Sequence, residues 1–199
     1  MARPPPREDG DANDQPPPQE DGERPARNDR PGAGENKSTA STPSAGNTFP
    51  FSSSGVGANG LLDAKFTCDG ESVSPPFQWS DLPVGTKSLA LTMHHIPGPG
   101  AKEHVYIVTW NIPATTKSLD AGKKNVGIWG VNTVNGRAQY APPCSKGPGE
   151  KTYVVTLYAL SEEPKLPASG KVSRSDWLAA IKDMTLGSSA IDLRYARQK

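Results

Sequence analysis

The sequence predicts a mostly-β domain with one helix near its C-terminus, preceded by a disordered tail. Several short runs are rich in β-branched and aromatic residues, which favour strands. Segments rich in Gly and Pro separate these runs, as is typical of loops. The first 47 of the 199 residues include no aromatic and no branched aliphatic residue. We therefore expect a core built from about 150 residues, a length that supports a single domain.

The N-terminal segment 1–47 is low-complexity sequence made mainly of Pro, Gly, Ser and charged residues. Within it, Pro4–Gly10 (PPPREDG) returns as Pro16–Gly22 (PPPQEDG), a repeat too short and polar for a solenoid unit. Such a segment cannot bury enough apolar surface to offset its ordering entropy. We expect a disordered tether, although its proline-rich repeats leave open a partner-binding motif. The folded domain is expected over 48–199.

The first half of this domain contains two predicted strands. Order is expected to begin near Phe49, and the mixed segment 61–66 is compatible with strand or coil. A Pro-Pro pair forces an extended entry into a short strand over 77–79. Residues 88–95 alternate, which predicts a strand that places on one face Leu89, Leu91, Met93 and His95.

The second half contains three more predicted strands and the helix. Residues 104–112 and 153–160 are β-branched and aromatic runs, which indicate strands. Residues 114–139 are rich in Gly, Asn and Thr and are expected to form loops. A serine that can cap a helix precedes 174–184, and a final strand is expected over 190–194.

A stretch rich in Pro and Gly, 140–153, leads into the predicted strand over 153–160. Pro142 and Pro143 fix their own φ angles, and Gly147 or Gly149 could adopt a positive φ. A rigid loop delivered onto a central strand is a common way to hold a binding site still. The alternative is an ordinary structural turn.

Composition excludes some classes of function. The formal net charge of +1 gives no reason to expect a nucleic-acid partner. No apolar run approaches the roughly 18 residues that a transmembrane segment needs, and no signal peptide is visible. The absence of a signal peptide favours a soluble, cytoplasmic protein, with export as the alternative.

Several blocks in order resemble the phosphatidylethanolamine-binding protein family, which includes the Raf kinase inhibitor proteins and their bacterial relatives. These blocks are Phe66–Trp79 (FTCDGESVSPPFQW), Leu82–Leu91 (LPVGTKSLAL) and Trp110–Pro113 (WNIP), followed by the loop 140–153, the next strand and the terminal helix. The resemblance covers about 48–199 and is closest to the bacterial-type branch. It implies a β-sandwich with a small anion-binding pocket at one end.

The pocket motifs depart from those of the family. Where the family has an Asp-Pro-Asp-Ala-Pro segment, this chain has His95–Pro99 (HIPGP). The family's pocket histidine on the next strand is replaced by Tyr106. In the Gly-His-Gly-x-His-x-Tyr element of the bacterial members, the two histidines are replaced by Pro148 and Lys151, while Tyr153 remains. Binding of a phosphate headgroup therefore does not follow from the resemblance alone.

The resemblance implies that His95, Tyr106 and Tyr153 surround one cavity, with a rim loop that contributes Pro143, Ser145, Lys146, Gly147 and Gly149. His and Tyr side chains can donate hydrogen bonds and Lys adds charge, so we expect a small anionic or polar ligand. A protein partner regulated through this pocket is a further expectation, and no cofactor is expected. In the alternative interpretation, His94 and His104 are exposed strand ends and His95 packs structurally. A metal site built from the three histidines would lack an accompanying carboxylate motif.

An enzyme is the second hypothesis. The sequence has no nucleophile elbow of the G-x-S-x-G kind. Cys144 lies close to Lys146, which could lower the pKa of its thiol and make it reactive. The alternative to a binding protein is therefore a hydrolase or a thiol-dependent enzyme that uses Cys144.

Cys68 and Cys144 are the two cysteines of the chain. The resemblance implies that both lie towards the pocket end, and a disulfide is possible if their Cα atoms come within about 7 Å. A bridge would fit an oxidising compartment, whereas free thiols would fit a cytosolic protein. The missing signal peptide favours free thiols.

Overall fold

The computed structural model describes residues 47–168 and 170–197. The predicted disordered tail therefore lies outside the described residues. The elements, in chain order, are β1 Phe51–Ser52, a 3-10 turn Ala64–Phe66, β2 Phe77–Trp79, β3 Ser88–His95, β4 His104–Pro113, β5 Ser118–Leu119, β6 Ile128–Trp129, β7 Lys151–Leu160, α1 Arg174–Ile181 and β8 Thr185–Tyr195.

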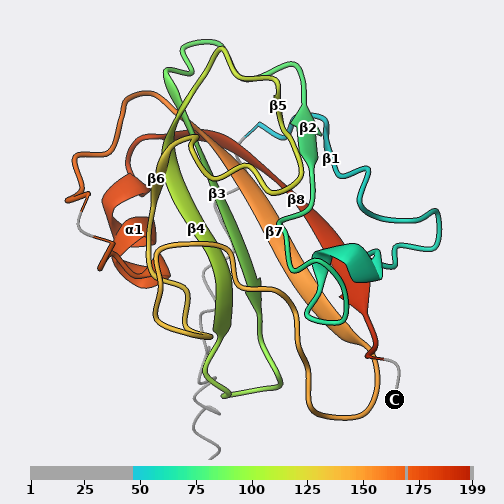
Figure 1. The fold of residues 1–199 in the computed structure, drawn as a ribbon. Coiled ribbons are helices and arrows are strands. Elements are labelled where there is room, and N and C mark those ends of the chain that lie inside the picture. Colours follow the sequence, from blue (N-terminus) through green and yellow to red (C-terminus); the bar gives the residue numbers. More distant parts are fainter. Residues whose placement is uncertain (1–46, 169, 198–199) are drawn as a thin grey trace, which may run out of the picture. The chain divides into compact units, whose positions relative to one another are not determined.

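The strands form two antiparallel sheets (Figure 1). The larger sheet has the order β6-β4-β3-β7-β8, and the smaller has the order β1-β2-β5. The two central strands β3 and β7 pair over most of their length, from Ser88↔Leu160 to His94↔Val154. This arrangement confirms the predicted mostly-β domain with a late helix.

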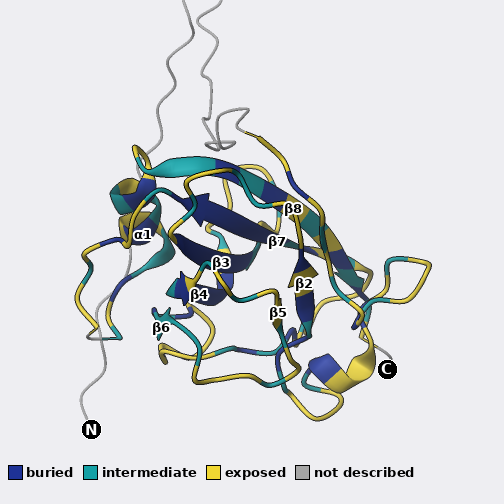
Figure 2. Cartoon of the chain, turned by 90° about the horizontal axis from the view of Figure 1, so that it is seen from above, coloured by how far each residue is buried: buried dark blue, intermediate teal, exposed yellow. Residues whose placement is uncertain are grey.

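The larger sheet is buried on both faces, and its central strands are the most buried segments of the ribbon (Figure 2). On β3, the predicted row of Leu89, Leu91 and Met93 joins the core cluster that also contains Phe77 and Trp79 of the smaller sheet. Alternate residues of a strand point to opposite faces, so the residues between them contribute to a second core. The period-2 pattern of the sequence therefore fixed which side chains face the smaller sheet.

Helix α1 covers the opposite face of the larger sheet. Trp177 and Ile181 of α1 are buried against a cluster that includes Ala90, Trp110 and Tyr158. Ser173 caps the helix as predicted, because its Oγ accepts a hydrogen bond from the backbone N–H of Asp176 at 3.2 Å. The domain thus has three layers: the smaller sheet, the larger sheet and a helix.

Several predicted boundaries were wrong. The helix ends at Ile181 instead of 184, where Thr185 Oγ1 donates a hydrogen bond to the Ile181 carbonyl and the chain turns into β8. The last strand begins at Thr185 instead of 190, because pairing along β7 overrides the low strand propensity of the Gly and Ser residues in between. Within the expected loop 114–139, two short strands pair with neighbouring strands. The segment 61–66 ends in the 3-10 turn.

A disulfide joins Cys68 to Cys144, with the two Cα atoms 5.3 Å apart. It links the loop after the 3-10 turn to the loop that precedes β7, across a sequence separation of 76 residues. The Cys68 backbone N–H also donates to the Pro143 carbonyl at 3.1 Å. The expected proximity of the two cysteine loops is therefore confirmed, whereas the preference for free thiols, which rested on the missing signal peptide, was wrong.

His94 lies on the α1 side of β3, one residue before His95, and is half-buried. Burial, with a smaller contribution from the positive charge of Arg174, lowers the pKa of His94 from 6.5 to about 4. Arg174 itself forms an ion pair with Glu103 at 2.7 Å. The interpretation of His94 as an exposed strand end was wrong.

Removal of the disulfide should destabilise the fold. Replacing both Cys68 and Cys144 by Ala is expected to lower the free energy of unfolding by about 2–4 kcal/mol, because the unfolded chain loses a long closed loop. Urea denaturation of both proteins, with and without reductant, measures this loss. Reductant should destabilise the wild type and leave the double variant unchanged. Equal urea midpoints for all four samples would contradict the prediction.

Stability should fall in mild acid because of His94. Its pKa is lower in the folded state than in the unfolded chain, so the unfolded state binds more protons between pH 6.5 and about 4. The free energy of unfolding is expected to decrease as the pH falls through this window. Urea denaturation of the wild type and His94→Gln at several pH values should give a shallower dependence in the variant. Identical slopes would show that His94 titrates alike in both states.

Candidate functional site

A cavity of about 520 Å³ lies at the end of the larger sheet where β3 stops, β4 starts and β7 starts. The same row of alternate residues that builds the core of β3 ends there in His95, and β4 contributes His104 and Tyr106 from one face. Its lining consists of His95, Pro97, His104, Tyr106, Thr133, Val134, Pro142, Cys144, Ser145, Lys146, Gly147, Lys151 and Tyr153.

Three aromatic rings form the inner wall of this cavity. The ring of Tyr153 lies 5.1 Å from that of Tyr106 in an edge-on arrangement and 5.4 Å from that of His95, measured between centroids. Both tyrosines are largely buried. Burial raises the pKa of Tyr106, and burial together with the neighbouring Tyr106 raises the pKa of Tyr153. Both phenols therefore stay protonated at neutral pH and can donate hydrogen bonds.

The imidazole of His95 is oriented by the backbone. Its Nδ1 lies 2.7 Å from the Thr152 carbonyl oxygen, and a carbonyl can only accept, so Nδ1 carries the proton. This assignment leaves Nε2 free for a ligand. His104 is exposed at the cavity mouth, with its ring 6.4 Å from that of His95.

The charges around the cavity are positive. Lys146 and Lys151 line it, and among the described residues its lining includes no Asp or Glu. The nearby carboxylate of Glu150 is held by Arg194 at 3.0 Å. Glu150 lines an adjoining cavity of about 370 Å³, which shares His95, Pro97 and Lys151 with the first cavity. Lys151 Nζ makes a long hydrogen bond of 3.4 Å to the Pro148 carbonyl. The cavity therefore favours an anion over a cation.

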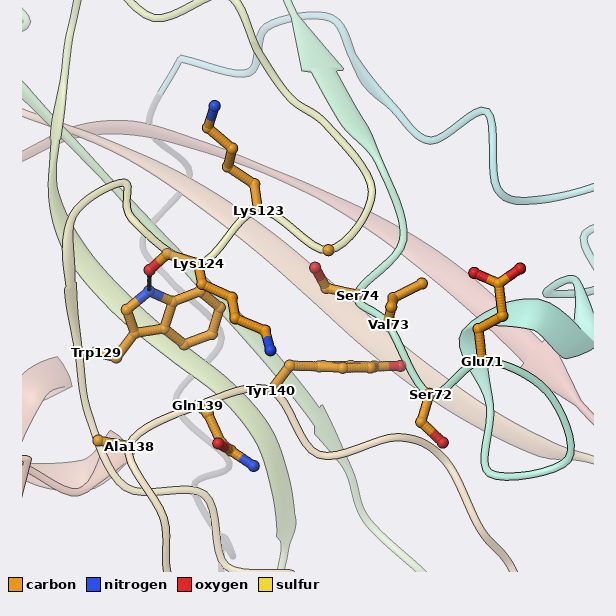
Figure 3. A pocket seen from close by; sticks show the side chains of 11 residues that line it. Glu71, Ser72, Val73, Ser74, Lys123, Lys124, Trp129, Ala138, Gln139 and Tyr140 are labelled. Carbon is orange, nitrogen blue, oxygen red and sulfur yellow. Dashed lines mark hydrogen bonds between the residues drawn. The ribbon is translucent and has the colours of Figure 1, made fainter.

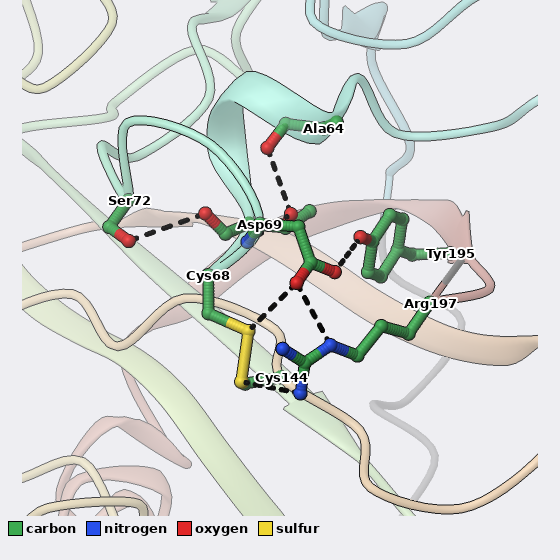
Figure 4. A network of polar contacts seen from close by, with 8 residues as sticks. Ala64, Cys68, Asp69, Ser72, Cys144, Tyr195 and Arg197 are labelled. Atoms are coloured by element: carbon green, nitrogen blue, oxygen red, sulfur yellow. Dashed lines mark hydrogen bonds and ion pairs between the residues drawn. A yellow bond between two sulfur atoms is a disulfide. The ribbon is translucent and has the colours of Figure 1, made fainter. Parts of the chain in front are cut away.

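The rim loop is anchored by a polar network around the disulfide (Figure 4). Asp69 accepts a hydrogen bond from the hydroxyl of Tyr195 and forms an ion pair with Arg197 at 2.8 Å. Arg197 Nη1 also lies 3.7 Å from Cys144 Sγ. The carboxylate of Asp69 is thus neutralised outside the cavity, and the start of the rim loop is tied to the C-terminal end of β8.

The structure brings together six of the eight residues predicted for the site: His95, Tyr106, Ser145, Lys146, Gly147 and Tyr153. Two predicted residues do not line the cavity. Pro143 is buried behind it, where its carbonyl accepts from Cys68, and Gly149 is exposed on the loop beyond the rim. Gly149 has the expected positive φ of 83°, whereas Gly147 does not adopt a positive φ.

Some lining residues were not predicted. His104 is exposed, as the alternative interpretation expects, and it also lines the cavity. Its position two residues before Tyr106 places both side chains on one face of β4, in agreement with this lining. Lys151, which stands where the bacterial members of the family have a histidine, also lines the cavity. Thr133 and Val134 enter from the loop after β6, whose path gave no sequence signal.

A second cavity, of about 300 Å³, lies between β6 and the segment 71–74 that precedes β2 (Figure 3). Its wall includes the rings of Trp129 and Tyr140 and the side chain of Lys124. Tyr140 lines this cavity and Pro142 lines the first, so one short stretch of the chain contributes to the walls of both cavities.

Within the described residues, no group of three or more His, Cys, Asp and Glu side chains is placed to hold a metal ion. The helix of the described region is too short and polar to cross a bilayer.

Comparisons with known proteins identify the family. The family described as "Phosphatidylethanolamine-binding protein" matches residues 52–196. A UPF0098 protein of Methanothermobacter thermautotrophicus is 33% identical over 144 residues, which cover 69% of this chain and 92% of that protein. A UPF0098 protein of Chlamydia muridarum is 28% identical over 134 residues, covering 65% and 87%.

Two solved structures share the fold. The phosphatidylethanolamine-binding protein homologue CT736 of Chlamydia trachomatis superposes with a TM-score of 0.69 at 22% identity, covering 76% of this chain and 99% of that one. YbcL of Escherichia coli superposes with a TM-score of 0.67 at 24% identity, covering 75% and 99%. The family match over most of the domain leads to one conclusion: the chain belongs to the phosphatidylethanolamine-binding protein family.

Proposed function

We propose that this protein is a non-enzymatic binding module whose first cavity holds a small anionic ligand such as a phosphate or carboxylate group. The observation that carries the proposal is the cavity lining, which combines two lysines and two histidines with phenol donors and includes no carboxylate among the described residues. An anion placed there would accept charge-assisted hydrogen bonds from Lys146 or Lys151. Family membership agrees with a role in ligand binding.

The arrangement of donors suggests how an anion would be held. The phenols of Tyr106 and Tyr153 remain neutral donors at the inner wall, where burial makes hydrogen bonds to a charged acceptor stronger. With Nδ1 of His95 bonded to the Thr152 carbonyl, the Nε2 of the neutral ring would accept a hydrogen bond from a protonated oxygen of the ligand. Lys146 is exposed at the rim and Lys151 is half-buried, and both would attract the anion from solution.

The enzyme hypothesis has less support from the geometry. Cys144 Sγ is bonded to Cys68, so a thiol-dependent reaction would first require reduction. Among the described residues the cavity lining includes no carboxylate, so a general base there would have to be His95 or His104. We therefore propose binding without turnover, with a protein partner regulated through the occupied pocket.

We also propose that the protein works in an oxidising compartment outside the cytoplasm. The disulfide supports this proposal, because such bridges persist chiefly in secreted and extracytoplasmic proteins. Thiol titration of the denatured protein, isolated without reductant from its native compartment, tests it. No reactive thiol is expected, and two would contradict the proposal.

Binding is tested by calorimetric titration with inorganic phosphate and O-phosphoethanolamine at low salt. Lys146→Ala and Lys151→Ala are each expected to weaken binding about five-fold, as for the loss of one partly exposed charge contact. Lys165→Ala serves as the matched control, because Lys165 is exposed and outside the cavity lining. O-phosphoethanolamine should be recovered unchanged after incubation.

Three results would contradict the proposed function. The first is an absence of binding at millimolar phosphate. The second is an equal affinity in all three lysine variants and the wild type. The third is cleavage of O-phosphoethanolamine by the wild-type protein, which would favour a hydrolase.

A further inference from the structure

The second cavity has an aromatic wall whose rings are fixed in place. Trp129 Nε1 donates to the Lys124 carbonyl at 2.9 Å, and the hydroxyl of Tyr140 donates to the Phe66 carbonyl at 2.6 Å. Because both polar ends are engaged by the backbone, the rings offer a ligand their apolar faces and edges. Burial raises the pKa of Tyr140, so its phenol keeps this proton at neutral pH.

The remaining walls are also held by hydrogen bonds. The side chain of Asn132 is fully buried, and its Nδ2 donates to the carbonyls of Arg137 at 2.8 Å and Gln139 at 3.0 Å. On the other side, the Gly122 N–H donates to the Ser74 carbonyl at 3.0 Å. A site with walls fixed in advance loses little conformational entropy when it binds a ligand.

A positively charged side chain, Lys124, lies beside the aromatic rings of this cavity. Glu71 is neutralised by Lys65 at 3.6 Å, whereas Lys124 has no ion-pair partner among the described residues. Figure 3 shows the side chain of Lys124 extending from beside the indole of Trp129 towards Tyr140, while that of Lys123 points away from both rings. One cation therefore stands next to two aromatic surfaces.

We propose that this cavity is a second ligand site, specific for a planar aromatic ring that carries an anionic group. The ring would pack against Trp129 and Tyr140, and the anionic group would pair with Lys124. A volume of about 300 Å³ accommodates a ligand of one or two rings. The proposal does not depend on the function of the first cavity, because the two share no lining residue.

The indole of Trp129 provides a direct measurement. The chain has four tryptophans, and Trp79, Trp110 and Trp177 are buried with exposures of 5%, 0% and 0%. Trp129 is half-buried and lines the cavity. Its indole N–H resonance in a ¹H–¹⁵N spectrum, assigned with Trp129→Phe, therefore reports on occupancy of this site.

The experiment titrates the full-length protein with naphthalene-2-carboxylate and follows this resonance. We expect a saturable shift. Naphthalene-2-carboxamide, which lacks the charge, and cyclohexanecarboxylate, which lacks the aromatic ring, should each bind at least about five-fold more weakly. Lys124→Ala should weaken binding of naphthalene-2-carboxylate by a similar factor, while Lys146→Ala, in the first cavity, should leave it unchanged.

The absence of a saturable shift of the Trp129 resonance would overturn the proposal. Equal binding of the carboxamide would show that Lys124 supplies no anion contact. An effect of Lys146→Ala without an effect of Lys124→Ala would place the ligand in the first cavity. Because Lys124 anchors Trp129 through its backbone carbonyl, the Ala variant keeps that hydrogen bond and its fold can be verified from the unchanged resonances of the buried tryptophans.

Discussion

Burial of the larger sheet on both faces is the constraint on which the rest of the structure depends. Because β3, β4 and β7 are covered on both sides, their residues must alternate between two cores, and a shift of one residue would exchange every side chain. The first cavity lies at the end of the sheet where one of these rows of side chains stops. His95, Tyr106 and Tyr153 occupy it because they continue the row that packs against the smaller sheet.

The electrostatic character of the cavity arises from where the carboxylates lie. Asp69 and Glu150 are both near the rim in sequence or space, yet Arg197 and Arg194 neutralise them outside the lining. The disulfide holds the start of the rim loop beside Asp69 and so belongs to the same arrangement. The chain as a whole is almost neutral. The cavity is positively charged because the fold places lysines in its lining and pairs the nearby carboxylates with arginines outside it.

Sequence reasoning succeeded where one local rule determines position. The alternation of β3 predicted the inward row that ends at His95, and the resemblance to the family placed Tyr106 and Tyr153 beside it. Sequence reasoning failed where the position of a residue depends on contacts with segments far away in the sequence. The extension of β8 to Thr185 follows from the β7 ladder. The cavity at Trp129 forms between β6 and the segment 71–74, and no periodic signal in the sequence predicts that these two segments lie close together. The disulfide was missed for another reason: both cysteines were expected at the pocket end, but the absence of a visible signal peptide favoured free thiols.

The central claim is that the first cavity binds an anion between its buried phenols and its basic rim. A crystal structure of the protein grown with millimolar phosphate tests it most directly. The account predicts phosphate density within hydrogen-bond distance of Tyr106 or Tyr153 and of at least one of His95, Lys146 and Lys151. Phosphate bound elsewhere, with a cation or only water between the two tyrosines and His95, would contradict the account.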